Sequence, residues 1–94
     1  TMTNLFAVLD GVAVTPRLEG CGVAGVMRAA LLDALPRAGV AVSERDLDPG
    51  SLAYASELFL TNALIGAWPV RRLGERGFVP GPVARRVQAL VAAW

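Results

Sequence analysis

Apolar and polar residues near the N-terminus follow the pattern of two short strands joined by a tight turn. Residues 4–9 form an apolar run, and residues 12–15 form a second run. Asp10-Gly11 lies between them, and an Asp-Gly pair between two such runs is a strong hairpin signal. Pro16 limits the second strand because proline has no N–H to give to a sheet. We therefore expect a β-hairpin whose first strand is covered on both faces.

A glycine-rich stretch, residues 19–25, leads into a predicted helix. Apolar residues recur there at a spacing of three or four, which places them on one helical face. These residues are Val23, Val26, Met27, Ala30, Leu31, Ala34 and Leu35. Pro36 and Gly39 are expected to end the helix.

The middle of the chain predicts a strand and a short helix. Residues 40–45 partly alternate between apolar and polar side chains, which indicates a third strand. Asp48 followed by Pro49 is typical of a helix N-cap with proline in the first turn. A short helix should therefore extend from there through Ala55.

The C-terminal part predicts two strands, a loop and a last helix. Residues 57–61 and 67–71 are the strands, and Pro69 should place the second one at a sheet edge or a bulge. Residues 74–81 are expected to form a loop. The last helix should begin at Pro82 and present one apolar face, formed by Val83, Val87, Leu90, Val91 and Trp94. Strands joined by short turns indicate an α+β domain rather than a Rossmann unit.

The composition indicates that much of the apolar surface must be buried against another protein surface. The chain has 94 residues and is 54% hydrophobic, which is more than the roughly 45–50% of an average soluble domain. A membrane span needs about 20 nearly continuous apolar residues, and charged side chains interrupt every candidate run. We therefore expect a partner surface, and no membrane segment, to account for the excess.

Charged and reactive residues exclude several classes of function. The net charge is +1 with acidic and basic residues interspersed, which gives no basic stripe for nucleic acid. Cys21 is the single cysteine and histidine is absent, so the sequence offers neither an internal disulfide nor a zinc ligand set. A cytoplasmic location is the expectation.

Two segments have the residue types of an anion site. Residues 22–28 are a glycine-containing loop that runs into a helix, where free N–H groups and the helix dipole suit a phosphate. Thr61 and Asn62 end an apolar strand, where they can offer donors to a ligand or cap a turn. Taken singly, each segment is better explained by ordinary turn structure. Arg28 can face a substrate carboxylate or, at least equally well, have a solvated or structural role.

Five motifs in register resemble the fold-type IV pyridoxal-phosphate enzymes, which include branched-chain and D-amino-acid aminotransferases. The motifs are residues 1–6, 15–16, 22–28, 56–63 and 68–70. Within this group, residues 25–28 and 61–70 are most similar to the 4-amino-4-deoxychorismate lyases. The resemblance implies an α+β C-terminal domain with a mostly antiparallel sheet or pseudo-barrel and two main flanking helices.

The resemblance also implies that the chain binds the phosphate of pyridoxal 5'-phosphate. The backbone N–H groups of Val26 and Met27 would bind it, with Gly25 leaving room. Asn62 and Ala63 would give the second contact. The implied cofactor-binding residues are therefore Gly25, Val26, Met27, Thr61, Asn62 and Ala63.

The chemistry of this family needs a lysine that holds the cofactor and moves protons, and this chain has no lysine. Arginine cannot replace it because arginine stays protonated. The family also places a glutamate shortly before the motif that begins here at Thr1. We therefore expect residues 1–94 to be the single C-terminal domain of a larger enzyme, inactive alone and without a catalytic residue, whose N-terminal half carries the lysine.

For the complete enzyme, the resemblance implies a homodimeric lyase of folate biosynthesis that cleaves the small molecule 4-amino-4-deoxychorismate to 4-aminobenzoate and pyruvate. A branched-chain or D-amino-acid aminotransferase is the alternative within the family. A noncatalytic binding or assembly module with this fold is the alternative of another class.

Overall fold

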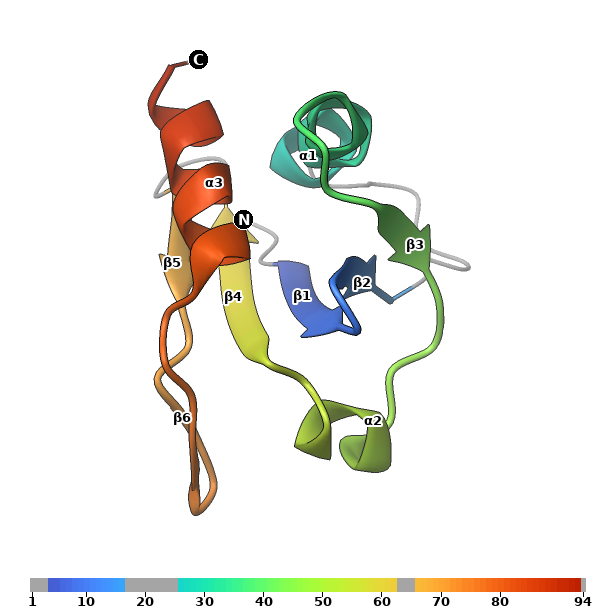
Figure 1. Cartoon of the computed structure of the whole chain (residues 1–94), viewed down its shortest axis with the longest axis vertical. Helices are drawn as coiled ribbons and strands as arrows, with labels where there is room; N and C mark the ends of the chain where they lie inside the picture. The colour runs from blue at the N-terminus through green and yellow to red at the C-terminus, as the bar shows by residue number, and fades with distance from the viewer. Residues whose placement is uncertain (1–3, 17–25, 63–65, 94) are drawn as a thin grey trace.

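The predicted N-terminal hairpin forms the centre of a five-stranded sheet. The computed structural model describes residues 4–16, 26–62 and 66–93. Its elements, in chain order, are β1 (Asn4–Leu9), β2 (Val12–Thr15), α1 (Val26–Arg37), β3 (Val42–Glu44), α2 (Pro49–Ala53), β4 (Glu57–Asn62), β5 (Gly66–Pro69), β6 (Arg72–Leu73), β7 (Arg76–Gly77) and α3 (Pro82–Ala92). The sheet has the strand order β3-β2-β1-β4-β5 (Figure 1).

The sheet is antiparallel except at one edge. β1 pairs antiparallel with both β2 and β4, β4 pairs antiparallel with β5, and β2 pairs parallel with β3. Asp10 and Gly11 join β1 to β2 with φ angles of 50° and 78°, as the tight turn of a two-residue hairpin requires. β5 contains Pro69 and lies at the sheet edge, which confirms the prediction made from that proline.

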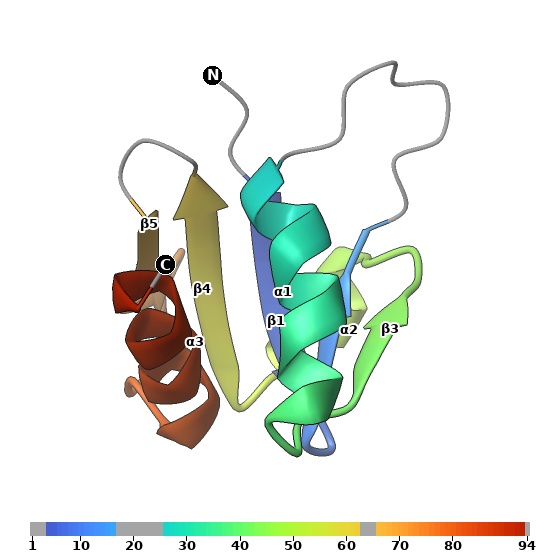
Figure 2. The same ribbon diagram turned by 90° about the horizontal axis from the view of Figure 1, so that it is seen from above.

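Two layers of apolar side chains pack on opposite faces of this sheet. α1 and α3 lie together over one face (Figure 2), where Phe6, Val8 and Phe59 form a core with Leu31 and Leu35 of α1. Ala7 and Leu58 point to the opposite face, where they pack with Ala55 and Phe78. The expectation that β1 is covered on both faces is therefore confirmed.

The end of α1 differs from the prediction at Pro36 and agrees with it at Gly39. α1 continues through Pro36 and ends at Arg37. The preceding Leu35 is fully buried, and its packing holds the last turn in place although the proline removes one hydrogen bond. Gly39 follows with a φ of +89°, and the N–H of Val40 donates to the carbonyl of Leu35 at 2.9 Å, which closes the helix.

α2 ends at Ala53 and not at Ala55, but its predicted cap is present. The backbone N–H of Ser51 donates to Oδ1 of Asp48 at 2.7 Å and lowers the pKa of the Asp48 carboxyl from its usual value. Because the pKa is lowered in the folded state, this contribution to stability is present above the usual carboxyl pKa. It is lost as the pH falls through the lowered value.

The predicted loop at residues 74–81 contains part of a small β-ribbon, so that prediction was wrong for its first half. β6 and β7 pair antiparallel around Gly74, whose φ is +60°. Each strand has two exposed residues, so it has no alternation of apolar and polar residues by which a strand could be predicted. Arg76 holds the ribbon to the region of α2 by donating to the carbonyls of Ala53 and Ala55, while its guanidinium lies over the ring of Phe78.

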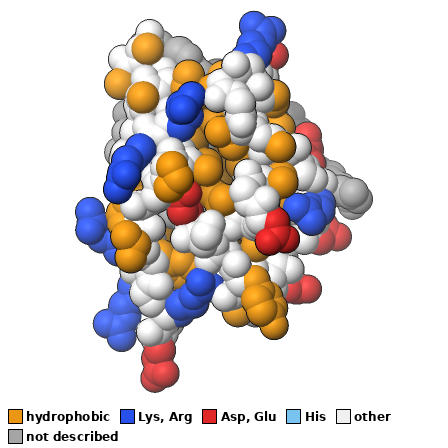
Figure 3. Space-filling model, in the orientation of Figure 1, with side chains coloured by type: hydrophobic (Ala, Val, Ile, Leu, Met, Phe, Trp, Pro, Cys, Tyr) orange, Lys and Arg blue, Asp and Glu red, His pale blue; other side chains and the backbone are white. Residues whose placement is uncertain are grey.

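Figure 3 shows apolar side chains in several places on one face of the molecule, with charged side chains scattered among them. Of the residues that the structure describes, Tyr54 and Val79 are the most exposed large hydrophobic ones, at 86% and 79%, and Leu73 is also exposed. Among the described residues, the helices are too short and too polar for any to cross a membrane.

Candidate functional site

The two segments predicted to bind an anion lie at the same end of the sheet. α1 begins at Val26, and β4 ends at Asn62. Figure 2 shows the first turn of α1 at the same end of the sheet as the tip of β4 and the start of β1. The structure therefore brings Val26 and Met27 to the end of the sheet where Thr61 and Asn62 lie. Gly25 and Ala63 lie outside the described residues.

Val26 and Met27 form the first turn of α1. The first N–H groups of a helix have no carbonyl within the helix to bond, and they carry the positive end of the helix dipole. The first turn contains no acidic residue that would oppose an anion. The Met27 side chain packs partly buried against the core, so Met27 can contribute its backbone N–H while its side chain anchors the turn.

Thr61 and Asn62 are buried at the end of β4, with exposed fractions of 0% and 5%. Thr61 lies on the face of β4 that α1 covers, because strand residues alternate and Phe59 belongs to that core. Its Oγ1 is buried and has no hydrogen-bond partner among the described residues. Burying a hydroxyl without a hydrogen-bond partner costs free energy. A ligand atom that forms this missing hydrogen bond would recover that cost.

Asn4 is a further polar residue at this end that the sequence pattern did not predict. It pairs directly with Thr61 across β1 and β4, so both side chains lie on the same face of the sheet. It is 7% exposed. The signal that would have found it is the strand register, which becomes visible only once β1 and β4 are paired.

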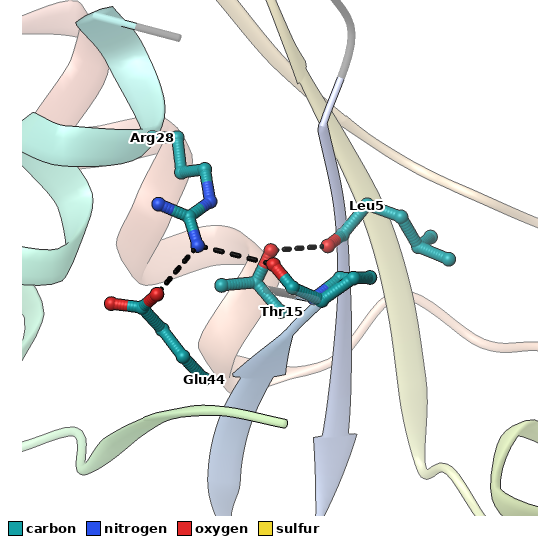
Figure 4. A network of polar contacts seen from close by, with 5 residues as sticks. Leu5, Thr15, Arg28 and Glu44 are labelled. Atoms are coloured by element: carbon teal, nitrogen blue, oxygen red, sulfur yellow. Dashed lines mark hydrogen bonds and ion pairs between the residues drawn. The ribbon is translucent and has the colours of Figure 1, made fainter. Parts of the chain in front are cut away.

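Arg28 is buried in the first turn of α1 and bonds to the ends of two strands (Figure 4). Its Nη2 donates to Oε2 of Glu44 at 3.0 Å and to the carbonyl oxygen of Pro16 at 3.1 Å. Beside it, Oγ1 of Thr15 donates to the carbonyl of Leu5 at 2.8 Å. Of the two roles left open for Arg28, the geometry supports the structural one.

Other features of the described residues do not compete with this end of the sheet. No group of three or more histidine, cysteine, aspartate or glutamate side chains is placed there to hold a metal ion. A hollow of about 470 Å³ lies between the second half of α1 and Leu90 of α3. A second hollow of about 390 Å³ lies between α2 and Phe78. The described residues of the predicted site line neither hollow.

Solved structures and curated proteins of one enzyme group match nearly the whole chain. The 4-amino-4-deoxychorismate lyase of Pseudomonas aeruginosa is 44% identical with a TM-score of 0.90, and the match covers 98% of this chain and 34% of that one. An aminotransferase of Brucella abortus, solved with the cofactor PLP bound, is 31% identical with a TM-score of 0.91, covering 99% and 33%. The branched-chain-amino-acid aminotransferase of Escherichia coli K12 is 34% identical, covering 90% and 28%.

These matches confirm the α+β fold expected from the resemblance, a mostly antiparallel sheet with two main flanking helices. The chain spans only about a third of the length of the proteins it matches. The family model for amino-transferase class IV matches residues 1–73. Since that match includes the sheet, α1 and both segments of the candidate site, the chain belongs to the amino-transferase class IV family.

Proposed function

We propose that this chain is the phosphate-binding domain of a pyridoxal-phosphate-dependent 4-amino-4-deoxychorismate lyase. The reaction would convert 4-amino-4-deoxychorismate to 4-aminobenzoate and pyruvate, a step of folate biosynthesis. The observation that carries the proposal is the 44% identity to the solved Pseudomonas aeruginosa lyase, compared with 34% to a solved Escherichia coli branched-chain aminotransferase.

The residues at the end of the sheet fit the phosphate group of this cofactor. The N–H groups of Val26 and Met27 would donate to phosphate oxygens, and the helix dipole would add about 0.3–1 kcal/mol. The buried Thr61 hydroxyl has no partner among the described residues, and a phosphate oxygen would give it one. We include Asn62, Gly25 and Ala63 in the proposed site.

The division of labour follows from the residue types present. When bound, pyridoxal phosphate supplies an electron sink for reaction at the carbon that bears the substrate amine. This chain would hold the phosphate and thereby orient the cofactor ring relative to the rest of the enzyme. The lysine that this chemistry requires must come from another part of the protein, because the chain contains none.

A branched-chain aminotransferase remains the second candidate because its Escherichia coli representative matches over 90% of the chain. The two candidates share the phosphate site and differ in the substrate. They are therefore separated by the reaction and not by the residues at the end of the sheet.

The reaction can be followed in the complete gene product that contains this chain. We expect the protein, saturated with pyridoxal phosphate, to release 4-aminobenzoate and pyruvate in equal amounts from 4-amino-4-deoxychorismate. Transfer of the amino group of leucine or valine to 2-oxoglutarate, without 4-aminobenzoate, would instead identify an aminotransferase. Failure to bind pyridoxal phosphate at all would favour a noncatalytic module.

Thr61 gives a second test of the phosphate site. Thr61→Val should lower the affinity for pyridoxal phosphate roughly tenfold or more, because a hydrogen bond to a charged oxygen is lost. The free energy of unfolding without cofactor should not fall, since the hydroxyl bonds to none of the described residues. Absorbance titration and urea unfolding measure the two quantities.

Thr15→Val is the matched control for Thr61→Val. Thr15 is equally buried, but its hydroxyl donates to the carbonyl of Leu5. Loss of this hydrogen bond in Thr15→Val should therefore reduce the free energy of unfolding by about 1 kcal/mol. An unchanged cofactor affinity in Thr61→Val would remove Thr61 from the proposed site.

A further inference from the structure

Arg28 joins the start of α1 to the residue that follows β2. β2 ends at Thr15, Pro16 follows it, and α1 begins at Val26. Arg28 lies in the first turn of α1, and its Nη2 donates to the carbonyl of Pro16 at 3.1 Å (Figure 4). The Arg28 side chain therefore ties the start of α1 directly to Pro16, just after the end of β2.

Glu44 holds the guanidinium in this position. β3 runs parallel to β2, and Glu44 is in register with Thr15, so its carboxylate rises at the same end of the sheet as Pro16. The ion pair measures 3.0 Å, with the Arg28 side chain 6% exposed and the Glu44 side chain 50% exposed. A guanidinium buried to this degree requires partners. Among the described residues, the two partners of Nη2 lie at strand ends, while the buried Nε has none. The sheet therefore determines where the first turn of α1 lies.

Position matters here because the proposed ligand is held by backbone N–H groups. Such donors bind an anion well only when they are aligned before it arrives, since ordering them on binding costs affinity. Arginine suits the task because its planar group can reach a carbonyl and a carboxylate together.

We infer that Arg28 is a positioning residue for the phosphate site, acting through the first turn of α1 rather than by contact with the ligand. The inference rests on the proposed function and adds to it the residue that aligns the donors. It assigns Glu44 and the carbonyl of Pro16 as the supports of Arg28.

The test compares two probes that differ only in the phosphate, pyridoxal 5'-phosphate and pyridoxal, in the complete gene product. In Arg28→Met, which keeps the length and apolar stem, the affinity for pyridoxal phosphate should fall about tenfold while that for pyridoxal changes little. The affinity of Arg28→Lys for pyridoxal phosphate should lie between those of Arg28→Met and the unmodified protein, because an ammonium keeps the charge but loses the planar geometry. Glu44→Gln should give a smaller loss of the same kind.

Arg37→Met is the control, since Arg37 is an exposed arginine in the last turn of the same helix. It should leave the affinities for both probes unchanged. Arg28→Lys and Glu44→Gln give the same comparison if Arg28→Met does not fold.

The outcomes separate this inference from the proposed function. If Arg28 is purely structural, Arg28→Met should lower the melting temperature or reduce the affinities for both probes equally, so that the ratio of the two affinities stays the same. This result would overturn the inference alone. An unmodified protein that binds pyridoxal phosphate no better than pyridoxal would overturn the phosphate site, and the inference with it.

Discussion

Replacing Phe59 by alanine should lower the free energy of unfolding by about 3–5 kcal/mol. Phe59 lies in the middle of β4 and is 1% exposed. Its ring stacks on that of Phe6 with a centroid distance of 5.1 Å and an interplanar angle of 3°. The substitution would leave a cavity beneath α1 and α3 and remove the contact between the aromatic rings of β1 and β4. Urea unfolding monitored by circular dichroism measures the loss.

Tyr54→Ala is the control for this prediction because Tyr54 is 86% exposed. Its effect should stay within about 0.5 kcal/mol. The loss of unfolding free energy in Phe59→Leu should lie between those in Tyr54→Ala and Phe59→Ala, since leucine retains most of the buried volume. A loss below about 1 kcal/mol in Phe59→Ala would contradict the central place given to the Phe6–Phe59 pair.

The core around Phe59 was predictable from the sequence because local patterns determine it. The apolar run of β1, the Asp10-Gly11 turn and the spacing of Leu31 and Leu35 each encode a short-range geometry. Pro69 also placed its strand at an edge by a local rule, the missing N–H. Such rules involve residues close in the chain and therefore need no knowledge of the strand order.

The candidate site was predictable only in part for the same reason. A glycine-containing loop before a helix and a polar pair at the end of a strand are local signals, and they indicated residues 22–28 and Thr61. The resemblance, and not these signals, assigned a role to Met27. The ion pair of Arg28 with Glu44 depends on β3 lying parallel beside β2, which no local pattern specifies. Asn4 likewise enters the site through the register of β1 and β4.

Two other features depended on long-range contacts and were missed. The ribbon of β6 and β7 has four exposed residues and is held largely by Arg76, which reaches carbonyls more than twenty positions earlier. Glu57 was predicted only as the first residue of a strand. Its carboxylate in fact accepts hydrogen bonds from the start of α3.

Replacing Glu57 by alanine should lower the free energy of unfolding by about 3–4 kcal/mol. The side chain is buried, and it accepts the N–H groups of Gly81, Val83 and Ala84 at 2.9, 3.1 and 2.9 Å. Pro82 has no N–H, so Glu57 satisfies every donor in the first turn of α3 up to Ala84. Hydrogen bonds to a charged group contribute about 1.5–3 kcal/mol each, and water entering the gap would recover part of the total.

The chemical details of this contact can be separated by matched variants. Glu57→Gln should cost less than Glu57→Ala, because its one carbonyl oxygen can still accept from Gly81 and Ala84 while its amide faces the N–H of Val83. Glu75→Gln, on the exposed ribbon, should change stability by less than about 0.5 kcal/mol.

Gly81 provides the decisive comparison, because Glu57 occupies the space that a side chain at position 81 would need. A Cβ on Gly81 would lie 2.6 Å from Cδ of Glu57, although its backbone φ of −119° suits any residue. Gly81→Ala should therefore destabilise the unmodified protein and have little effect in the Glu57→Ala background, where that carboxylate is gone. A double-mutant cycle by urea unfolding measures this coupling. Additive effects would mean that Glu57 and the start of α3 do not act as one contact, and that α3 is held to the sheet by its apolar face alone.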